Sequence, residues 1–264
     1  MIEDKKILLA GPWVGEFGHE LFCWQAYVRK LSREFKKTII VGRPGHKYLY
    51  EDFCSEYIEF DPKSYKTNGR FCIDAESPSD IIKNINHTFY FDGNFDIGVP
   101  YSRKEPKNNL LLSIQEFYKY EFKGDKSYDL IFHCRNKSTG SDRNWCKENW
   151  YKLYESLPES LKIACIGNSE AFYIEGTDDL RGIEIKELVG ILNQSKLIIG
   201  PSSGPMHLAS LCGMTHLVWS IEYNRRRYES EWNPFKTKVI FCSDGGWNPD
   251  FKQINKLILS HFLL

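Results

Sequence analysis

The segment 196–213 has the sequence KLIIGPSSGPMHLASLCG and combines residue types that can bind an anion. An apolar strand runs into a turn at residues 200–204, and an apolar helix begins directly after it. Such a turn directs backbone N–H groups and the positive end of a helix dipole to one point. Two glycines, one of them Gly204, let a phosphate approach the backbone, and the hydroxyls of Ser202 and Ser203 can donate to it. An ordinary strand–helix turn with Ser203 as helix cap fits the same spacing.

A second polar loop, at residues 135–144, carries three cations. They are Arg135, Lys137 and Arg143, and they stand among hydroxyls that include Ser138. A diphosphate needs such donors, and a guanidinium can bind it with two parallel hydrogen bonds. The alternative is a solvated surface loop. A further charge run, Arg225–Arg227, could help to bind phosphate or an acidic acceptor, but such runs are commonly solvated faces.

Candidate acid–base groups follow the first predicted strand. Glu16, His19 and Glu20 lie in or just after the loop 11–18. A carboxylate within about 3 Å of an acceptor hydroxyl can remove its proton. Glu16 is therefore a candidate general base, with His19 and Glu20 as rivals. The alternative is that Glu16 only complements the dipole of the helix that follows it.

Strands and helices alternate in both halves of the chain, which is typical of a doubly wound α/β sheet. Ligands of such sheets bind beyond the carboxyl ends of the strands, where all of the loops above begin. We therefore expect two Rossmann-like domains, residues 1–125 and 126–264, facing each other across a cleft. The predicted strands are 6–10, 38–41, 57–60, 87–91, 96–99, 128–134, 161–167, 183–185, 197–199 and 216–220, and the predicted helices are 19–35, 47–54, 147–157, 187–194, 206–212 and 251–262.

Composition excludes several classes of protein. The 264 residues include 35 basic and 35 acidic side chains, whereas a dedicated nucleic-acid binder normally has a basic excess. No apolar run reaches the roughly 18 residues of a membrane span, and the first residues do not resemble a signal peptide. The eight cysteines form no Cys-x-x-Cys pair. We therefore expect a reduced, cytoplasmic protein without a metal site or cofactor.

Three segments resemble known glycosyltransferases. GPSSGPMHLASLCGMTHLVWS resembles the donor-binding segment of GT-B glycosyltransferases, above all the bacterial heptosyltransferase family, at Gly204, Met206, His207, Leu208 and Ala209. KKILLAGPWVGEFGHELFCWQAYVRKL is similar to the start of that family, in which an acidic residue at the position of Glu16 acts as catalytic base. RNWCKENW, residues 143–150, is similar to a family element whose basic residue meets the donor phosphates.

The resemblance implies a metal-independent, inverting transfer of a sugar from a nucleotide-diphosphate sugar to a hydroxyl of a glycan or glycolipid. It also implies that His207 contacts phosphate or ribose and that the last helix packs back on the N-terminal domain. His133-x-Arg135 is also similar to an element of GDP-fucose-dependent fucosyltransferases, whose arginine holds the pyrophosphate. A sugar-nucleotide epimerase, a pyruvyl transferase and a non-catalytic nucleotide- or carbohydrate-binding protein fit the same pattern of residues.

Overall fold

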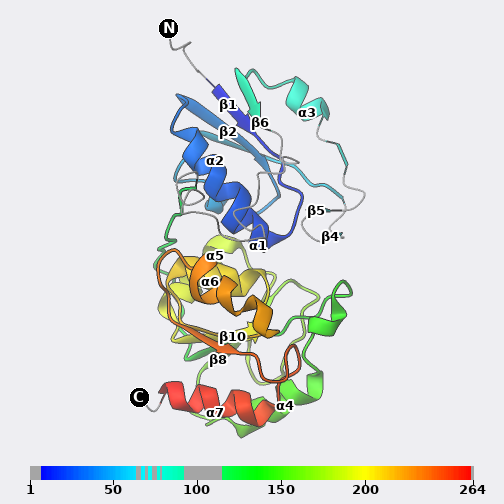
Figure 1. Cartoon of the computed structure of the whole chain (residues 1–264), viewed down its shortest axis with the longest axis vertical. Coiled ribbons are helices and arrows are strands. Elements are labelled where there is room, and N and C mark those ends of the chain that lie inside the picture. The colour runs from blue at the N-terminus through cyan, green and yellow to red at the C-terminus, as the bar shows by residue number, and fades with distance from the viewer. Residues whose placement is uncertain are drawn as a thin grey trace. The chain divides into compact units, whose positions relative to one another are not determined.

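The chain forms two compact units, Met1–Tyr118 and Lys119–Leu264 (Figure 1). The computed structural model describes residues 7–63, 67–68, 71–72, 76–77, 79–91 and 115–262. The predicted strand 96–99 lies outside these residues. Each unit is built on a parallel sheet, which confirms the α/β class.

The N-terminal unit has a four-stranded parallel sheet in the order β3-β2-β1-β6. The helix between β1 and β2 is continuous but changes type, because its middle section is π-helical. The elements are β1 (Ile7–Ala10), α1 (Phe17–His19), π-helical η1 (Glu20–Trp24), α2 (Gln25–Ser32), β2 (Lys37–Gly42), the 3-10 turn η2 (Lys47–Leu49), β3 (Glu56–Glu59), the antiparallel pair β4 (Thr67–Asn68) and β5 (Phe71–Cys72), α3 (Ser79–Lys83) and β6 (Phe89–Phe91).

The core of this unit is formed by apolar side chains of the sheet strands. Leu9, Ile39, Val41 and Phe60 form one buried cluster. The helix that spans residues 17–32 is buried along most of its length. Within it, Arg29 is 1% exposed, and its guanidinium donates to the Asp52 carboxylate at 2.7 and 3.1 Å.

The C-terminal unit has a six-stranded parallel sheet in the order β12-β11-β10-β7-β8-β9. Figure 1 shows α4 and α7 on one face of this sheet and α5 and α6 on the other. The elements are β7 (Leu130–His133), the 3-10 turn η4 (Ser141–Arg143), α4 (Lys147–Ser156), β8 (Ile163–Gly167), β9 (Asp178–Arg181), α5 (Ile185–Gln194), β10 (Leu197–Pro201), α6 (Gly204–Cys212), β11 (His216–Trp219), the 3-10 turn η5 (Glu222–Asn224), π-helical η6 (Arg227–Glu231), β12 (Val239–Cys242) and α7 (Phe251–Phe262).

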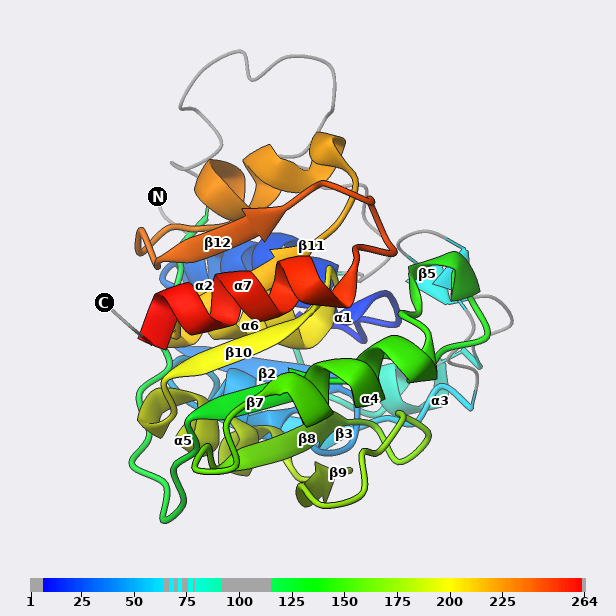
Figure 2. The same cartoon turned by 90° about the horizontal axis from the view of Figure 1, so that it is seen from below.

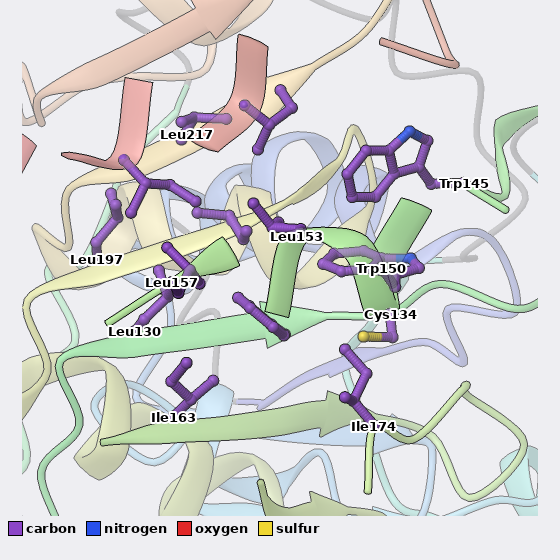
Figure 3. Packing of buried hydrophobic residues seen from close by; sticks show 14 of the residues in the cluster. Leu130, Cys134, Trp145, Trp150, Leu153, Leu157, Ile163, Ile174, Leu197 and Leu217 are labelled. Atoms are coloured by element: carbon purple, nitrogen blue, oxygen red, sulfur yellow. The ribbon is translucent and has the colours of Figure 1, made fainter. Parts of the chain in front are cut away.

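Three tryptophans dominate the core between this sheet and the α4/α7 layer, and Figure 3 shows two of them, Trp145 and Trp150. Figure 2 shows α4 and α7 lying over the strands of the sheet. The ring centre of Trp145 lies 4.9 Å from that of Trp150 and 4.9 Å from that of Trp219. Ile254 and Ile258 of α7 belong to the same buried cluster. The last helix therefore contributes to the core of its own unit, and its predicted packing on the N-terminal domain stays a prediction.

Two of the predicted elements are wrong. Residues 183–185 form no strand, since Ile185 begins α5, and the strand of this region is β9. Leu180 is the only buried residue of that edge strand, so its sequence lacks an apolar pattern. The predicted helix 47–54 is only the 3-10 turn η2 followed by irregular turns. Strand β12 was not predicted either, although its four residues, Val-Ile-Phe-Cys, are apolar.

Both sheets reverse their winding direction beside their first strand. The chain winds from β1 to β2 and β3, and β6 then pairs with the other side of β1. In the same way it winds from β7 to β8 and β9, and β10 then pairs with the other side of β7. Ligands of open α/β sheets bind at such switch points, outside the carboxyl ends of the strands. The loops after β1, β7 and β10 are therefore the places to look for a site.

Candidate functional site

A glycine fixes the start of the loop after β1. Gly11 has φ +111°, and a Cβ atom there would lie 2.0 Å from the Val41 carbonyl oxygen. Its N–H donates to the Phe91 carbonyl at 3.0 Å, and its own carbonyl accepts from the Tyr90 hydroxyl at 3.0 Å. Only glycine allows this close approach and this φ. The loop thus leaves the sheet between β1 and β6, at the switch point of the N-terminal unit.

Glu16 and His19 lie together at the end of this loop. The His19 Nδ1 atom is 3.6 Å from the Glu16 Oε2 atom, and the two side chains are 14% and 36% exposed. The Glu16 carbonyl accepts from the Trp13 indole at 3.3 Å, which fixes the backbone of the residue. The arrangement presents a partly exposed carboxylate beside an imidazole, and this pair can accept and pass on a proton.

Glu20, the third candidate base, lies inside the unit. Its carboxylate accepts a 2.6 Å bond from the Tyr50 hydroxyl and lies 2.9 and 3.0 Å from the His46 Nδ1 atom. Burial alone would raise the pKa of Glu20, but His46, Arg43 and Tyr50 stabilise the anion and together lower the pKa below its ordinary value. A carboxylate that is held in this way is a poor proton acceptor. The geometry favours Glu16 over Glu20 as a base.

In the C-terminal unit, Arg135 folds the loop that follows β7. Its guanidinium is buried and donates to the carbonyls of Thr139 at 2.7 Å and Gly140 at 2.8 Å, and to the side-chain oxygen of Asn144. Asn144 in turn bonds to the backbone of Lys137. Sequence reasoning expects Arg135 to bind the diphosphate directly, whereas the structure gives it partners within the loop.

The other cations of this loop are more accessible. Lys137 and Ser138 are exposed, and Arg143 is half-buried. The Arg143 guanidinium lies 5.7 Å from the centre of the Trp247 ring. The loop therefore presents two cations and a hydroxyl to solvent at the carboxyl end of β7. These groups suit an anionic ligand better than Arg135 does.

The turn between β10 and α6 lies beside β7. A Cβ atom on Gly200 would be 2.9 Å from the Cβ atom of His133, so the two strands approach closely here. Ser203 occupies the cap position of α6, but its hydroxyl donates to the Pro201 carbonyl at 3.0 Å and makes no capping bond. The first turn of a helix has backbone N–H groups without helical partners. Ser203 and Gly204, both half-buried, carry the accessible part of this turn.

Ser202 and His207 lie beneath the turn rather than on it. Ser202 is 3% exposed and His207 is 4% exposed. The Tyr228 hydroxyl donates to Ser202 Oγ at 2.9 Å and lies 3.2 Å from His207 Nε2, while the His207 and Tyr228 rings stack with centres 4.5 Å apart. Sequence reasoning missed Tyr228, which comes from the π-helical turn η6. The Trp232 ring also contacts His207. The one signal for these contacts in the sequence is the spacing of the two aromatic residues, Tyr228 and Trp232.

Replacement of Tyr228 by phenylalanine is expected to lower the free energy of unfolding by about 1–3 kcal/mol, because Ser202 and His207 each lose a buried hydrogen-bond partner. Urea unfolding measures this change. Tyr223→Phe is the matched control, since Tyr223 is 51% exposed, and it should change the free energy by less than about 0.5 kcal/mol. Equal effects of the two variants would contradict the importance of the Tyr228 contacts.

The charge run Arg225–Arg227 is paired with neighbouring acids. Arg225 bonds to Glu222 at 2.6 Å and to Glu229 at 3.0 Å, and Arg226 bonds to Glu231 at 2.9 Å. The Arg227 guanidinium lies over the Trp232 ring at 4.7 Å. These contacts favour the structural interpretation of the run.

Two buried histidines make this unit sensitive to acid. Burial, with the charges of Lys137 and Arg135, lowers the pKa of His133 to about 3, and burial lowers the pKa of His216 to about 4. In the unfolded chain both protonate near pH 6.5, so below that pH the unfolded state binds more protons. The free energy of unfolding is expected to fall as the pH decreases from about 6.5 towards 4, by up to about 1.4 kcal/mol per pH unit for each histidine.

Urea unfolding of the wild type and of His216→Leu over this pH range measures the effect. The slope of the variant should be smaller than that of the wild type by up to about 1.4 kcal/mol per pH unit, because the contribution of His216 is lost. Identical slopes would show that His216 is not kept neutral in the folded state.

The described residues contain no group of three or more His, Cys, Asp or Glu side chains that could hold a metal ion. Within the same part of the chain, no helix is both long and apolar enough to span a membrane.

No protein-family model matches the chain, and no curated protein matches its sequence. Solved structures do match. The glycosyl transferase family 9 protein from Veillonella parvula DSM 2008 has 12% identity and a TM-score of 0.60, over 100% of this chain and 98% of that one. The E. coli ADP-heptose lps heptosyltransferase II has 12% identity and a TM-score of 0.63, over 98% of both chains. The E. coli heptosyltransferase WaaC, solved with ADP, has 11% identity and a TM-score of 0.60, over 97% of both.

At this identity the likeness shows the fold. The chain has the α/β fold of GT-B glycosyltransferases, as the sequence resemblance implied, and it matches these structures over nearly its whole length.

Proposed function

We propose that this protein is a glycosyltransferase that moves a sugar from a nucleotide-diphosphate sugar to an acceptor hydroxyl. The observation that carries the proposal is the switch point of the C-terminal unit. There β10, which ends at the turn 202–204, pairs with β7, and the loop after β7 carries Lys137 and Arg143. The full-length likeness to heptosyltransferases, one of them solved with ADP, supports a nucleotide ligand.

The diphosphate would bind to the N–H groups at the start of α6 and to the cations of the loop 135–144. Negative charge grows on the diphosphate as the bond to the sugar breaks. Fixed N–H dipoles and cations stabilise that charge without a metal ion. Arg135 would act by holding the loop in shape, through its bonds to Thr139, Gly140 and Asn144.

The N-terminal unit would supply the base. Glu16 removes the proton from the acceptor hydroxyl, and the oxygen attacks the anomeric carbon as the diphosphate leaves from the opposite side. One such displacement inverts the configuration of that carbon. His19, at 3.6 Å from the Glu16 carboxylate, would relay or share the proton. The acceptor class, a glycan or glycolipid, follows from the resemblance.

A binding panel tests the donor site first. ADP, GDP, UDP, CDP and dTDP are added one at a time. A nucleotide present at about a hundred times its dissociation constant raises the free energy of unfolding by roughly 2.7 kcal/mol. The melting temperature should rise for at least one of them. The rise should be much smaller in the double variant Lys137→Gln/Arg143→Gln. Lys186 lies on α5 and serves as the control, so Lys186→Gln should show the same rise as the wild type. The proposal would be overturned if none of the five nucleoside diphosphates raised the melting temperature of the wild type.

A further inference from the structure

The loop that carries Glu16 is held from a second element, the segment that follows β2. Arg43 is the first residue after β2, and its guanidinium donates a 2.6 Å bond to the Gly15 carbonyl. Three residues further on, the His46 ring packs edge-on against Phe17 at 5.5 Å. The two contacts lie on either side of Glu16 in the sequence. The segment after β2 therefore reaches the loop immediately before and immediately after the proposed base.

Arg43 is itself firmly anchored. It is 9% exposed, and its carbonyl accepts a 2.7 Å bond from the Tyr57 hydroxyl. The preceding Gly42 lets Tyr57 approach, because a Cβ atom there would lie 2.3 Å from the Tyr57 hydroxyl oxygen. The backbone of Arg43 is thus fixed to β3. The bond from its guanidinium to Gly15 therefore ties the loop to the sheet.

The backbone of Glu16 is fixed on its other side as well. The Glu16 carbonyl accepts from the Glu20 N–H at 3.0 Å and from the Trp13 indole at 3.3 Å. Glu20 is in turn held by His46 and Tyr50, both from the segment after β2. The segment after β2 thus binds the peptide group before the Glu16 Cα atom directly, through Arg43. It also holds the side chain of Glu20, the residue whose N–H binds the peptide group after that atom.

We propose that Arg43 is a positioning residue: through the Gly15 carbonyl it sets the place of the Glu16 carboxylate. This inference rests on the function proposed above. A displacement of about 1 Å of a catalytic group can slow a reaction by about a hundredfold. Loss of the guanidinium would release Gly15 and widen the range of positions that Glu16 adopts, while the donor site, which belongs to the other unit, keeps its own contacts.

Two measurements on the full-length protein test this role, on the variants Arg43→Met and Arg43→Lys. The first is hydrogen exchange of the peptides that cover residues 11–19. The second is the separation of kcat from KM in sugar transfer. In Arg43→Met, exchange should speed up by about tenfold or more and kcat should fall by about a hundredfold, with the donor KM within about twofold of the wild type. Arg43→Lys, which can still donate to the Gly15 carbonyl, should recover part of both.

Arg29→Met is the matched control. Arg29 is another buried arginine of the same unit, but it bonds to Asp52 and to the Glu116 carbonyl. Its loss should lower the melting temperature at least as much as Arg43→Met does, with exchange at residues 11–19 and kcat close to those of the wild type.

The outcomes separate the two ideas. Unchanged exchange at residues 11–19 in Arg43→Met, or a loss of kcat in Arg29→Met as large as that in Arg43→Met, would overturn the positioning role. A wild-type protein that binds no nucleotide and transfers no sugar would overturn the proposed function instead, and the exchange experiment would still decide whether Arg43 holds the loop.

Discussion

Replacement of Glu16 by glutamine is expected to lower kcat for sugar transfer by at least about a hundredfold. Glutamine keeps the size of the side chain and its place beside His19, but it cannot accept a proton. Nucleotide affinity should change by less than about twofold, because the lost interaction is made in the transition state and not with the donor. Steady-state kinetics and calorimetric titration of the matching nucleoside diphosphate measure the two effects.

Glu51→Gln serves as the control, since Glu51 is an exposed carboxylate of the same unit. It should leave both quantities unchanged. His19→Asn tells the two rivals apart: if Glu16 is the base, this variant should slow transfer less than Glu16→Gln does. A loss of nucleotide affinity in Glu16→Gln would show that the residue binds the donor and is not the base.

Arg135→Ala is expected to weaken nucleoside diphosphate binding by about a hundredfold, although its guanidinium points into the protein loop. The side chain makes three hydrogen bonds within residues 135–144. Each bond from a charged group contributes about 1.5–3 kcal/mol, and about 2.7 kcal/mol corresponds to a hundredfold change in affinity. Without these bonds the loop no longer holds Lys137 and Arg143 in place. Calorimetric titration of the wild type and the variant measures the loss.

A double-mutant cycle with Arg143→Gln shows whether Arg135 acts through the loop. If it does, the two effects are strongly non-additive, since Arg143 contributes little once the loop is disordered. Arg181→Ala is the control, because Arg181 also bonds to a loop carbonyl, that of Ala171, in the same unit. Additive losses for Arg135 and Arg143 would instead show that both contact the ligand independently.

Buried strands were predicted well from the sequence, as were the edge strands β3 and β6 of the N-terminal sheet, whereas the edge strands β9 and β12 of the C-terminal sheet were missed. β7, β8 and β10 are buried at nearly every residue, and their apolar residues form continuous runs, Leu-Ile-Phe in β7, Ile-Ala-Cys-Ile in β8 and Leu-Ile-Ile in β10. β9 buries only Leu180, and β12 buries only Cys242. The polar sequence of β9 cannot be distinguished from a loop, whereas β12 was missed although all four of its residues are apolar.

The candidate site was predicted in its loops but not in its internal contacts. Glycines, hydroxyls and cations after apolar strands indicated where a ligand would bind. Burial was invisible, so Arg135, Ser202 and His207 were expected to face the ligand, although all three are buried. Arg43 and Tyr228 support the loops from segments distant in sequence, and only the folded chain brings them there.

The reversal of winding beside β7 divides the C-terminal unit into two halves of the polypeptide. One half, β7 to β9, brings the cationic loop; the other, β10 to β12, brings the turn at the start of α6. A chain interrupted at the Gly182 turn between them would leave each fragment with only part of the anion site. A nucleoside diphosphate would then bind tightly only when the two fragments associate, and its binding would in turn stabilise their association.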